Sequence, residues 1–237
     1  MEFNDFERVI RQEQGSLSQA FPALMRKVYV WMTLALAIPG LTAYGVAHSE
    51  NLMTLIFTNR VLFWGLIIAE LALVFSVTAA INRLSLTVAT LLFILYSVVN
   101  GATLAFIFAV YSTAVITKVF FITAGTFAAM ALYGYFTKSD LSKMGKIAFM
   151  AVIGLIIASL VNLFLHSPVL DLIVSYVGVL TFVGLTAWDT QKIKQMLAMQ
   201  EYADENAQKL ALTGALSLYL DFINLFIYLL RIFGNRN

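Results

Sequence analysis

Three carboxylic acids lie inside long apolar stretches of this 237-residue sequence. Glu70 falls within VLFWGLIIAELALVF, Asp221 within ALSLYLDFINLF, and Asp189 near the end of an apolar run that closes as GLTAWDTQKI. A charged side chain at the centre of a bilayer costs about 2.5–3.5 kcal/mol on insertion scales, so these acids are functional candidates. Two carboxyl groups in a dry interior can share a proton, and carboxylate oxygens are ligands that suit Ca²⁺. Protons and Ca²⁺ would then compete for one site.

Each acid also has a purely structural interpretation. Asp189 can be an interfacial residue paired with Lys192, three positions later. Glu70 can hydrogen-bond a neighbouring helix, and Asp221 can be a buried neutral acid. Asp189 and Asp221 are 32 residues apart, and Asp221 falls deeper in its segment. Contact between them therefore requires a bend or an axial offset.

The last apolar segment carries a polar stripe. At about 100° per residue, its polar and small residues fall within an arc of about 100°. Such a stripe should face the bundle interior or a water-filled cavity rather than lipid. We expect Ser217 and Asn224, with Glu70, to line an ion pathway, and Ser97, Asn100 and Thr103 to face the interior. The stripe consists of Thr213, Gly214, Ser217, Asp221, Asn224 and Tyr228.

The composition is that of an integral membrane protein. Hydrophobic residues make up 61% of the chain and charged residues 12%, against about 25% charged in a soluble domain. The mean hydropathy is +0.86. The absence of cysteine excludes disulfides and thiolate metal sites, and a net charge of +2 is too small to indicate nucleic-acid binding. No HExxH, GxSxG or GxGD motif is found, so we expect a protein that is not an enzyme.

Seven apolar segments are long enough to cross a bilayer, which takes roughly 20 residues. We predict an all-α polytopic bundle, with a cytoplasmic tail over 1–27 and a seven-helix transmembrane domain over 28–237. The charged stretch 192–209 is expected to be a solvated linker. The predicted spans are 28–48, 61–82, 86–110, 114–136, 147–166, 169–190 and 211–233.

Basic residues predict the orientation, because cytoplasmic loops are enriched in lysine and arginine. With a cytoplasmic N-terminus, eleven basic residues fall on the cytoplasmic side, and only Arg60 and Lys118 fall in the opposite loops. Arg231 and Arg236 oppose this count if the last segment spans fully, so a segment that dips and returns is an open alternative. The eleven are Arg8, Arg11, Arg26, Lys27, Arg83, Lys138, Lys143, Lys146, Lys192, Lys194 and Lys209.

Four motifs resemble those of the Bax inhibitor-1 family, also called the transmembrane Bax inhibitor motif family. ALSLYLDFINLFIYLLRIFG (215–234) is similar to the family's C-terminal signature, and VGLTAWDTQKIK (183–194) is similar to its sixth-helix motif. YSVVNGATLAFIFAVY (96–111) and YGYFTKSDLSKMG (133–145) resemble two more. The resemblance extends from about residue 26 to the end of the chain.

This resemblance implies six helices around a central seventh and a pH-sensitive Ca²⁺ leak across the membrane. It implies that Asp189 and Asp221 form a dyad that senses pH and binds the ion, and that Glu70 is the second-helix acid. A basic residue is implied to latch onto the dyad, and Arg83 is the best match. Other bacterial relatives lack the acids and resemble regulators of a membrane protease.

We therefore expect a bacterial inner-membrane Ca²⁺ leak channel that is regulated by protons. It would hold Ca²⁺ only transiently and no resident cofactor. Its partners would be the lipid bilayer, Ca²⁺ and protons, with no nucleic acid. The alternative is a non-transporting membrane partner of a protease or stress-response complex, docking through its tail and 192–209. A small-solute transporter is a third hypothesis, which no inverted repeat or Gly/Pro-broken helix pair supports.

Overall fold

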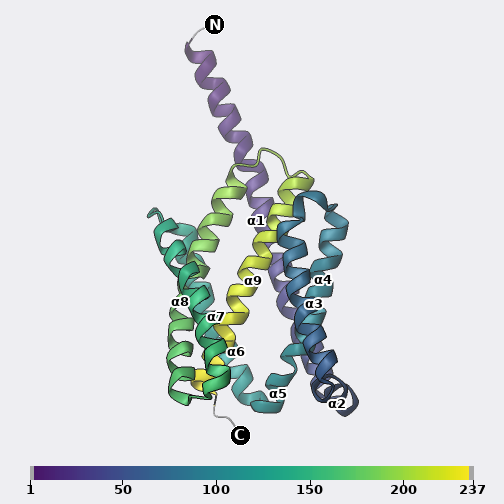
Figure 1. Cartoon of the computed structure of the whole chain (residues 1–237). Helices are drawn as coiled ribbons and strands as arrows, with labels where there is room; N and C mark the ends of the chain where they lie inside the picture. The colour runs from purple at the N-terminus through teal and green to yellow at the C-terminus, as the bar shows by residue number, and fades with distance from the viewer. Residues whose placement is uncertain (1–2, 235–237) are drawn as a thin grey trace.

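The computed structural model describes the backbone of residues 3–234 and the side chains of residues 20–234. The described chain is a bundle of helices without strands (Figure 1). Seven helices are long and apolar enough to cross a membrane, and each matches one predicted span. The elements are α1 (Phe3–Ala47), α2 (Glu50–Thr58), α3 (Arg60–Ala79), the 3₁₀ turn η1 (Ile81–Arg83), α4 (Leu86–Leu104), α5 (Phe106–Val110), α6 (Thr113–Phe136), α7 (Ser142–Leu165), α8 (Pro168–Ala198) and α9 (Glu205–Phe233).

Helix α9 is the centre of the bundle. It runs obliquely between α7 and α8 on one side and α3 and α4 on the other (Figure 1). Of its most apolar 18-residue window, 61% is buried, whereas no other span exceeds 39%. It packs against α1, α4, α6 and α8, and its pairing with α8 is the most extensive in the described chain. The predicted arrangement of six helices around a central seventh is therefore confirmed.

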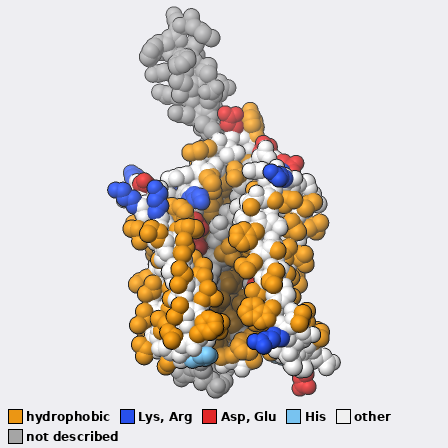
Figure 2. All heavy atoms as spheres, in the orientation of Figure 1, with side chains coloured by type: hydrophobic (Ala, Val, Ile, Leu, Met, Phe, Trp, Pro, Cys, Tyr) orange, Lys and Arg blue, Asp and Glu red, His pale blue; other side chains and the backbone are white. Residues whose placement is uncertain are grey.

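The outer surface of the bundle is apolar along its length (Figure 2). Large side chains such as Phe75, Phe121, Phe164 and Leu180 point outward and are exposed in the isolated chain. An exposed apolar belt of this extent is what a lipid-facing surface requires, because hydrocarbon solvates these groups and water does not. The chain is an integral membrane protein.

The structure corrects the prediction that 192–209 is a solvated linker. Helix α8 continues to Ala198 and α9 already begins at Glu205, so only residues 199–204 connect them. The stretch is amphipathic: Ile193 and Leu197, four positions apart, are buried, while most of its charged residues are exposed. The charged residues of 192–209 suggested a linker. Its buried apolar residues recur at helical spacing, and they allow α8 and α9 to continue into the stretch.

The N-terminal end of α1 and the C-terminal end of α9 lie at opposite ends of the bundle (Figure 1). Helix α9 is unbroken over 29 residues, so the alternative in which the last segment dips and returns is wrong. Helix α1 continues without a break across the expected boundary between residues 27 and 28. The side chains of Arg8, Arg11 and Arg236, which entered the charge count, lie outside the described residues.

Glycines allow the backbones of neighbouring helices to touch where α8 is held. A Cβ at Gly134 of α6 would lie 2.1 Å from the carbonyl oxygen of Ala187, and one at Gly145 of α7 would lie 2.2 Å from the Trp188 ring. Small residues serve this purpose in pairs of membrane helices. In lipid, helices associate through close packing because burying apolar surface gives no gain over contact with acyl chains. Both contacts fall on residues next to Asp189, so they fix the part of α8 that carries it.

Gly134→Ala should destabilise the protein by about 1–3 kcal/mol, because the added methyl group meets backbone that cannot swing away. The matched control is Gly125→Ala on the same helix, where a Cβ meets nothing within 4 Å. Thermal unfolding in detergent, followed by circular dichroism, should show a lower melting temperature for the first variant only. Equal melting temperatures for the two variants would contradict the close α6–α8 contact.

Candidate functional site

Asp189 of α8 and Asp221 of α9 meet inside the bundle. Their side chains lie within hydrogen-bonding reach of each other. Asp221 is only 4% exposed, and Asp189 is half-buried. Among the described residues, no hydrogen-bond donor reaches Oδ2 of Asp221. A hydrogen bond between two carboxyl groups requires one of them to hold a proton.

The structure shows how an acid near the end of one segment reaches an acid deeper in the next. Helix α8 extends beyond Asp189 by more than two turns, so that residue is further from the end of its helix than hydropathy suggests. Helix α9 then crosses α8 obliquely rather than descending parallel to it (Figure 1). Close approach is possible because Gly214 faces Ile193, where an added Cβ would lie 3.1 Å away.

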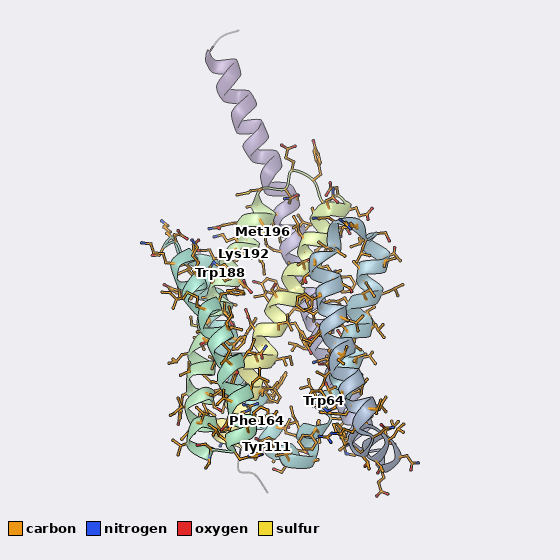
Figure 3. All side chains as sticks on the ribbon, in the orientation of Figure 1. Trp64, Tyr111, Phe164, Trp188, Lys192 and Met196 are labelled. Carbon is orange, nitrogen blue, oxygen red and sulfur yellow. The ribbon has the colours of Figure 1, made fainter. Side chains whose placement is uncertain are left out.

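Lys192 does not pair with Asp189. Its ammonium instead lies 4.9 Å from the ring centroid of Trp188, and both residues face the same side of α8 (Figure 3). The ion pairs found in the described chain join Lys209 to Glu205 and Arg231 to Asp171. Among the described residues no direct ion pair joins Lys192 to Asp189, although the lysine is near enough to act on that carboxyl group electrostatically. The Asp221 carboxyl group lies within hydrogen-bonding reach.

The segment around Asp189 is held by polar contacts as well as by glycines. Gln191 accepts a hydrogen bond from the backbone N–H of Leu141 (2.9 Å) and donates one to the carbonyl of Ser139 (2.8 Å). Lys194 donates to the carbonyl of Tyr135 (2.6 Å) and lies over the ring of that residue. Polar side chains thus satisfy the backbone between α6 and α7 and attach it to α8.

Glu70 belongs to a second polar cluster on another face of α9. Thr103 donates a hydrogen bond to Glu70, and Asn100 lies within hydrogen-bonding reach of the same carboxyl group. The hydroxyl of Tyr219 donates to Oδ1 of Asn100 at 2.5 Å. Tyr219 and Asp221 are two residues apart, so they point about 200° apart around the helix. Helix α9 therefore separates the Glu70 cluster from the aspartate pair.

A cavity of about 440 Å³ borders the Glu70 cluster. Glu70, Asn100 and Thr103 form its polar wall, and the rings of Phe57, Phe63 and Phe106 are among its apolar lining. In the space-filling view, the two halves of the bundle are separated by a hollow that leads inward (Figure 2). Water or an ion that enters this side would meet one carboxyl group.

The other expected site residues occupy different surroundings. Ser217 and Asn224 are half-buried on the face of α9 that carries Asp221, and Asn224 donates to the carbonyl of Leu220 at 2.8 Å. Arg83 is exposed in η1, and within the described residues no ion pair joins it to either aspartate. Its role as a latch stays a prediction.

Sequence analysis did not single out Tyr219, although it did place Asn100 and Ser97 in the interior, where both are buried. Tyr219 is fully buried and looks like one more apolar residue of the segment. The available signal was chemical, because a phenol in the middle of a membrane helix needs an acceptor, and Asn100 supplies one.

The described residues contain no group of three or more histidines, cysteines or acids that could hold a metal ion. Ca²⁺ takes six to eight oxygen ligands. The aspartate pair by itself can thus supply only part of a coordination shell, which suits brief contact with a passing ion better than storage.

Comparison with known proteins identifies the family. The family model described as inhibitor of apoptosis-promoting Bax1 matches residues 22–237. This chain belongs to the Bax inhibitor-1 family. It is 54% identical over 213 residues to the inner membrane protein YbhL of Escherichia coli strain K12, a match that covers 90% of this chain and 91% of that protein.

More distant relatives are matched over similar lengths. An uncharacterised protein of Borreliella burgdorferi is 43% identical over 212 residues, which is 90% of this chain and 91% of that protein. An uncharacterised membrane protein of Streptococcus pyogenes serotype M1 is 37% identical over 234 residues, covering 97% of this chain and 98% of that protein. The family match therefore applies to the bundle as a whole.

The four sequence motifs that resemble the family meet one another in space. The 133–145 motif packs on the 183–194 motif through Gly134 and Gly145. The 96–111 motif meets the 215–234 motif through the bond from Tyr219 to Asn100. The motifs thus mark contacts of α8 with α6 and α7, and the contact of α4 with the central helix.

Tyr219→Phe should destabilise the protein by about 1–3 kcal/mol, because Oδ1 of Asn100 would lose its donor while staying buried. Tyr176→Phe, on the exposed face of α8, is the matched control and should have no effect. Thermal unfolding of Tyr219→Phe, Asn100→Leu and the double variant completes a mutant cycle. We expect the double variant to lose less stability than the sum of the single ones, and strict additivity would contradict the bond.

Proposed function

We propose that the protein is a proton-regulated Ca²⁺ leak channel of the bacterial inner membrane, with its N-terminus in the cytoplasm. The observation that carries the proposal is the contact between the half-buried Asp189 and the buried Asp221. Each carboxyl group is costly to insert within a membrane span. A pair that served only to join two helices would not need to lie there. The name of the Escherichia coli relative supports the location.

The proposed gate follows from the charge of the pair. When the two carboxyl groups share a proton, they hydrogen-bond to each other and hold α8 against α9. When the pH rises and the proton leaves, two negative charges in a medium of low dielectric constant repel each other strongly. The same charges attract a divalent cation, so loss of the proton both loosens the contact and favours entry of Ca²⁺. Flux should therefore increase as the pH rises.

Glu70 and the polar residues of α9 supply the rest of the proposed path. Glu70 lines a cavity on the far side of α9, while Ser217 and Asn224 extend the polar face on either side of Asp221. A movement of α9 would change the Glu70 cavity and the aspartate pair together, because the helix contacts both α4 and α8. Arg83 is the proposed alternative partner of the ionised pair.

The alternative, a non-transporting regulator, gains less from the structure. Its proposed docking segment, 192–209, uses Lys194, Ile193 and Leu197 for contacts inside the bundle. Such contacts leave less of the segment for a protein partner. No observation within the described residues favours the regulator over the channel.

The test is Ca²⁺ entry into liposomes that contain the purified protein, measured with an internal dye as the pH is raised through neutrality. Wild type should conduct more at the higher pH. In Asp221→Asn, the change of Ca²⁺ flux with pH should be about tenfold smaller than in wild type. The variant lacks the repulsion between two carboxylates, and a repulsion of about 1.4 kcal/mol is enough to shift an equilibrium tenfold. An amide keeps a hydrogen bond to Asp189 but cannot ionise.

Asp140→Asn is the matched control. Asp140 lies between α6 and α7, where hydrogen bonds from the Ser142 side chain and backbone hold the pKa of its carboxyl group below the ordinary value. It stays ionised throughout the tested range, so its substitution should leave the profile unchanged. Absence of flux at every pH would exclude a channel, and flux that ignores both pH and Asp221→Asn would exclude the gate.

A further inference from the structure

A second polar cavity lies at the end of the bundle opposite the N-terminal end of α1, far from the aspartate pair along α8. It has a volume of about 450 Å³ and lies between α7, α8 and α9. Its polar lining includes Ser159, Asn162, His166, Asp171 and Arg231. Acidic and basic side chains therefore share one cavity, which is unusual in a chain with so few charges.

The two charged residues form a loose ion pair at the mouth of the cavity. The guanidinium of Arg231 lies 3.5 Å from Oδ1 of Asp171, and their side chains are 35% and 28% exposed. A guanidinium has five N–H donors and a carboxylate about four acceptor positions, so each can contact a ligand without leaving the other. A ligand that complements both carries a negative and a positive group a few bonds apart.

Arg231 is positioned by an aromatic stack. Its guanidinium lies 5.5 Å from the ring centroid of Tyr228. That ring rests on Gly178, where a Cβ would lie 2.6 Å away, and it stacks on Phe182 at 5.9 Å. The Tyr228 hydroxyl lies within hydrogen-bonding reach of Ser159, which lines the cavity. The part-exposed guanidinium of Arg231 is therefore held in place by a ring that packs into the bundle.

The turn between α7 and α8 forms the opposite rim. His166 adopts a left-handed conformation with φ of 48°, and its Nδ1 lies 3.1 Å from the carbonyl oxygen of Phe164. Asn162 accepts a hydrogen bond from the backbone N–H of Ser167 at 3.0 Å. Because Nδ1 donates to that carbonyl, Nε2 of the neutral ring can only accept a hydrogen bond.

The cavity lies where α7 ends and α8 begins, at one end of two membrane-spanning helices. Phe164, at the end of α7, is 82% exposed, and Leu165 and Val169 beside it also point outward. Figure 3 shows Phe164 at the same end of the bundle as Tyr111. Exposed apolar side chains thus lie next to a cavity that is lined by charged and polar ones, and the ends of membrane-spanning helices are where lipid headgroups are met.

We propose that this cavity binds the headgroup of a zwitterionic phospholipid of the phosphoethanolamine type. Its phosphate would contact Arg231, and its primary ammonium would contact Asp171. The acyl chains would lie along the apolar side chains at the ends of α7 and α8. This assignment requires neither ion flux nor a titrating aspartate pair, so it is independent of the proposed channel.

The chemistry separates this headgroup from related ones. A glycerol headgroup has the phosphate but no cation for Asp171. A choline headgroup has a cation that cannot donate a hydrogen bond. A primary ammonium has three donors, and charge-assisted hydrogen bonds of this kind are roughly twice as strong as neutral ones.

The test uses the full chain purified in detergent and titrated separately with phosphatidylethanolamine, phosphatidylcholine and phosphatidylglycerol. Bound lipid is counted by native mass spectrometry, and the melting temperature is followed in parallel. Wild type should retain phosphatidylethanolamine about tenfold better than phosphatidylglycerol, as expected for one additional hydrogen bond to a charged group. Asp171→Asn should lose this preference, and Arg231→Gln should lose retention of both lipids.

Arg60→Gln is the matched control, because Arg60 is an exposed arginine at the same end of the bundle and outside the cavity. It should behave as wild type. Equal retention of the three lipids by wild type, or undiminished retention by Arg231→Gln, would overturn the proposal. Saturation by soluble phosphoethanolamine at the lipid's own concentrations would also overturn it, because the site would then bind a free metabolite. If Arg231→Gln fails to elute as a monodisperse species, Asp171→Asn alone decides the preference.

Discussion

A carboxyl group at the centre of a membrane protein needs a partner, and Asp221 obtains one from α8. Hydrocarbon cannot solvate its charge, and the enclosing helices replace water on every side of it. The pairing with Asp189 requires α8 and α9 to approach closely and to cross at an angle. Gly214 on α9 permits the approach, and Gly134 and Gly145 hold the adjacent part of α8 against α6 and α7. Much of the packing around α8 can thus be understood from this one contact.

Helix α9 connects two polar systems that do not touch. One face carries Asp221 toward α8, and the other carries Tyr219 toward Asn100 on α4 and, through it, toward Glu70 on α3. A helix that is buried on all sides can transmit a displacement from one cluster to the other, because both are attached to the same rigid element. This connection supplies a physical route by which protonation on one side could change a cavity on the other.

Helix α8 is held by close packing and by polar contacts along its length. Near Asp189, glycines and the side chains of Gln191 and Lys194 attach the helix to α6 and to the turn that follows it. At the far end, Tyr228 of α9 fills the space above Gly178 and supports Arg231. Both parts of the α8–α9 pair are therefore held by aromatic or polar contacts, and Asp189 lies within the part that Gln191 and Lys194 hold.

The sequence by itself determined the class of protein, the seven spans and the acids that lie within them, because hydropathy and intramembrane charge are properties of single segments. The span predicted at 114–136 agrees with α6 within one residue. The predicted spans on either side of 192–209 were too short. A mean hydropathy does not detect an amphipathic helix whose apolar face is as narrow as that of Ile193 and Leu197. Only the tertiary structure decided that Asp189 and Asp221 meet, that Glu70 stands apart, and that Tyr219 joins Asn100. Those facts depend on the tilt of α9 and on the rotation of each helix about its axis, which are set by packing among several helices at once.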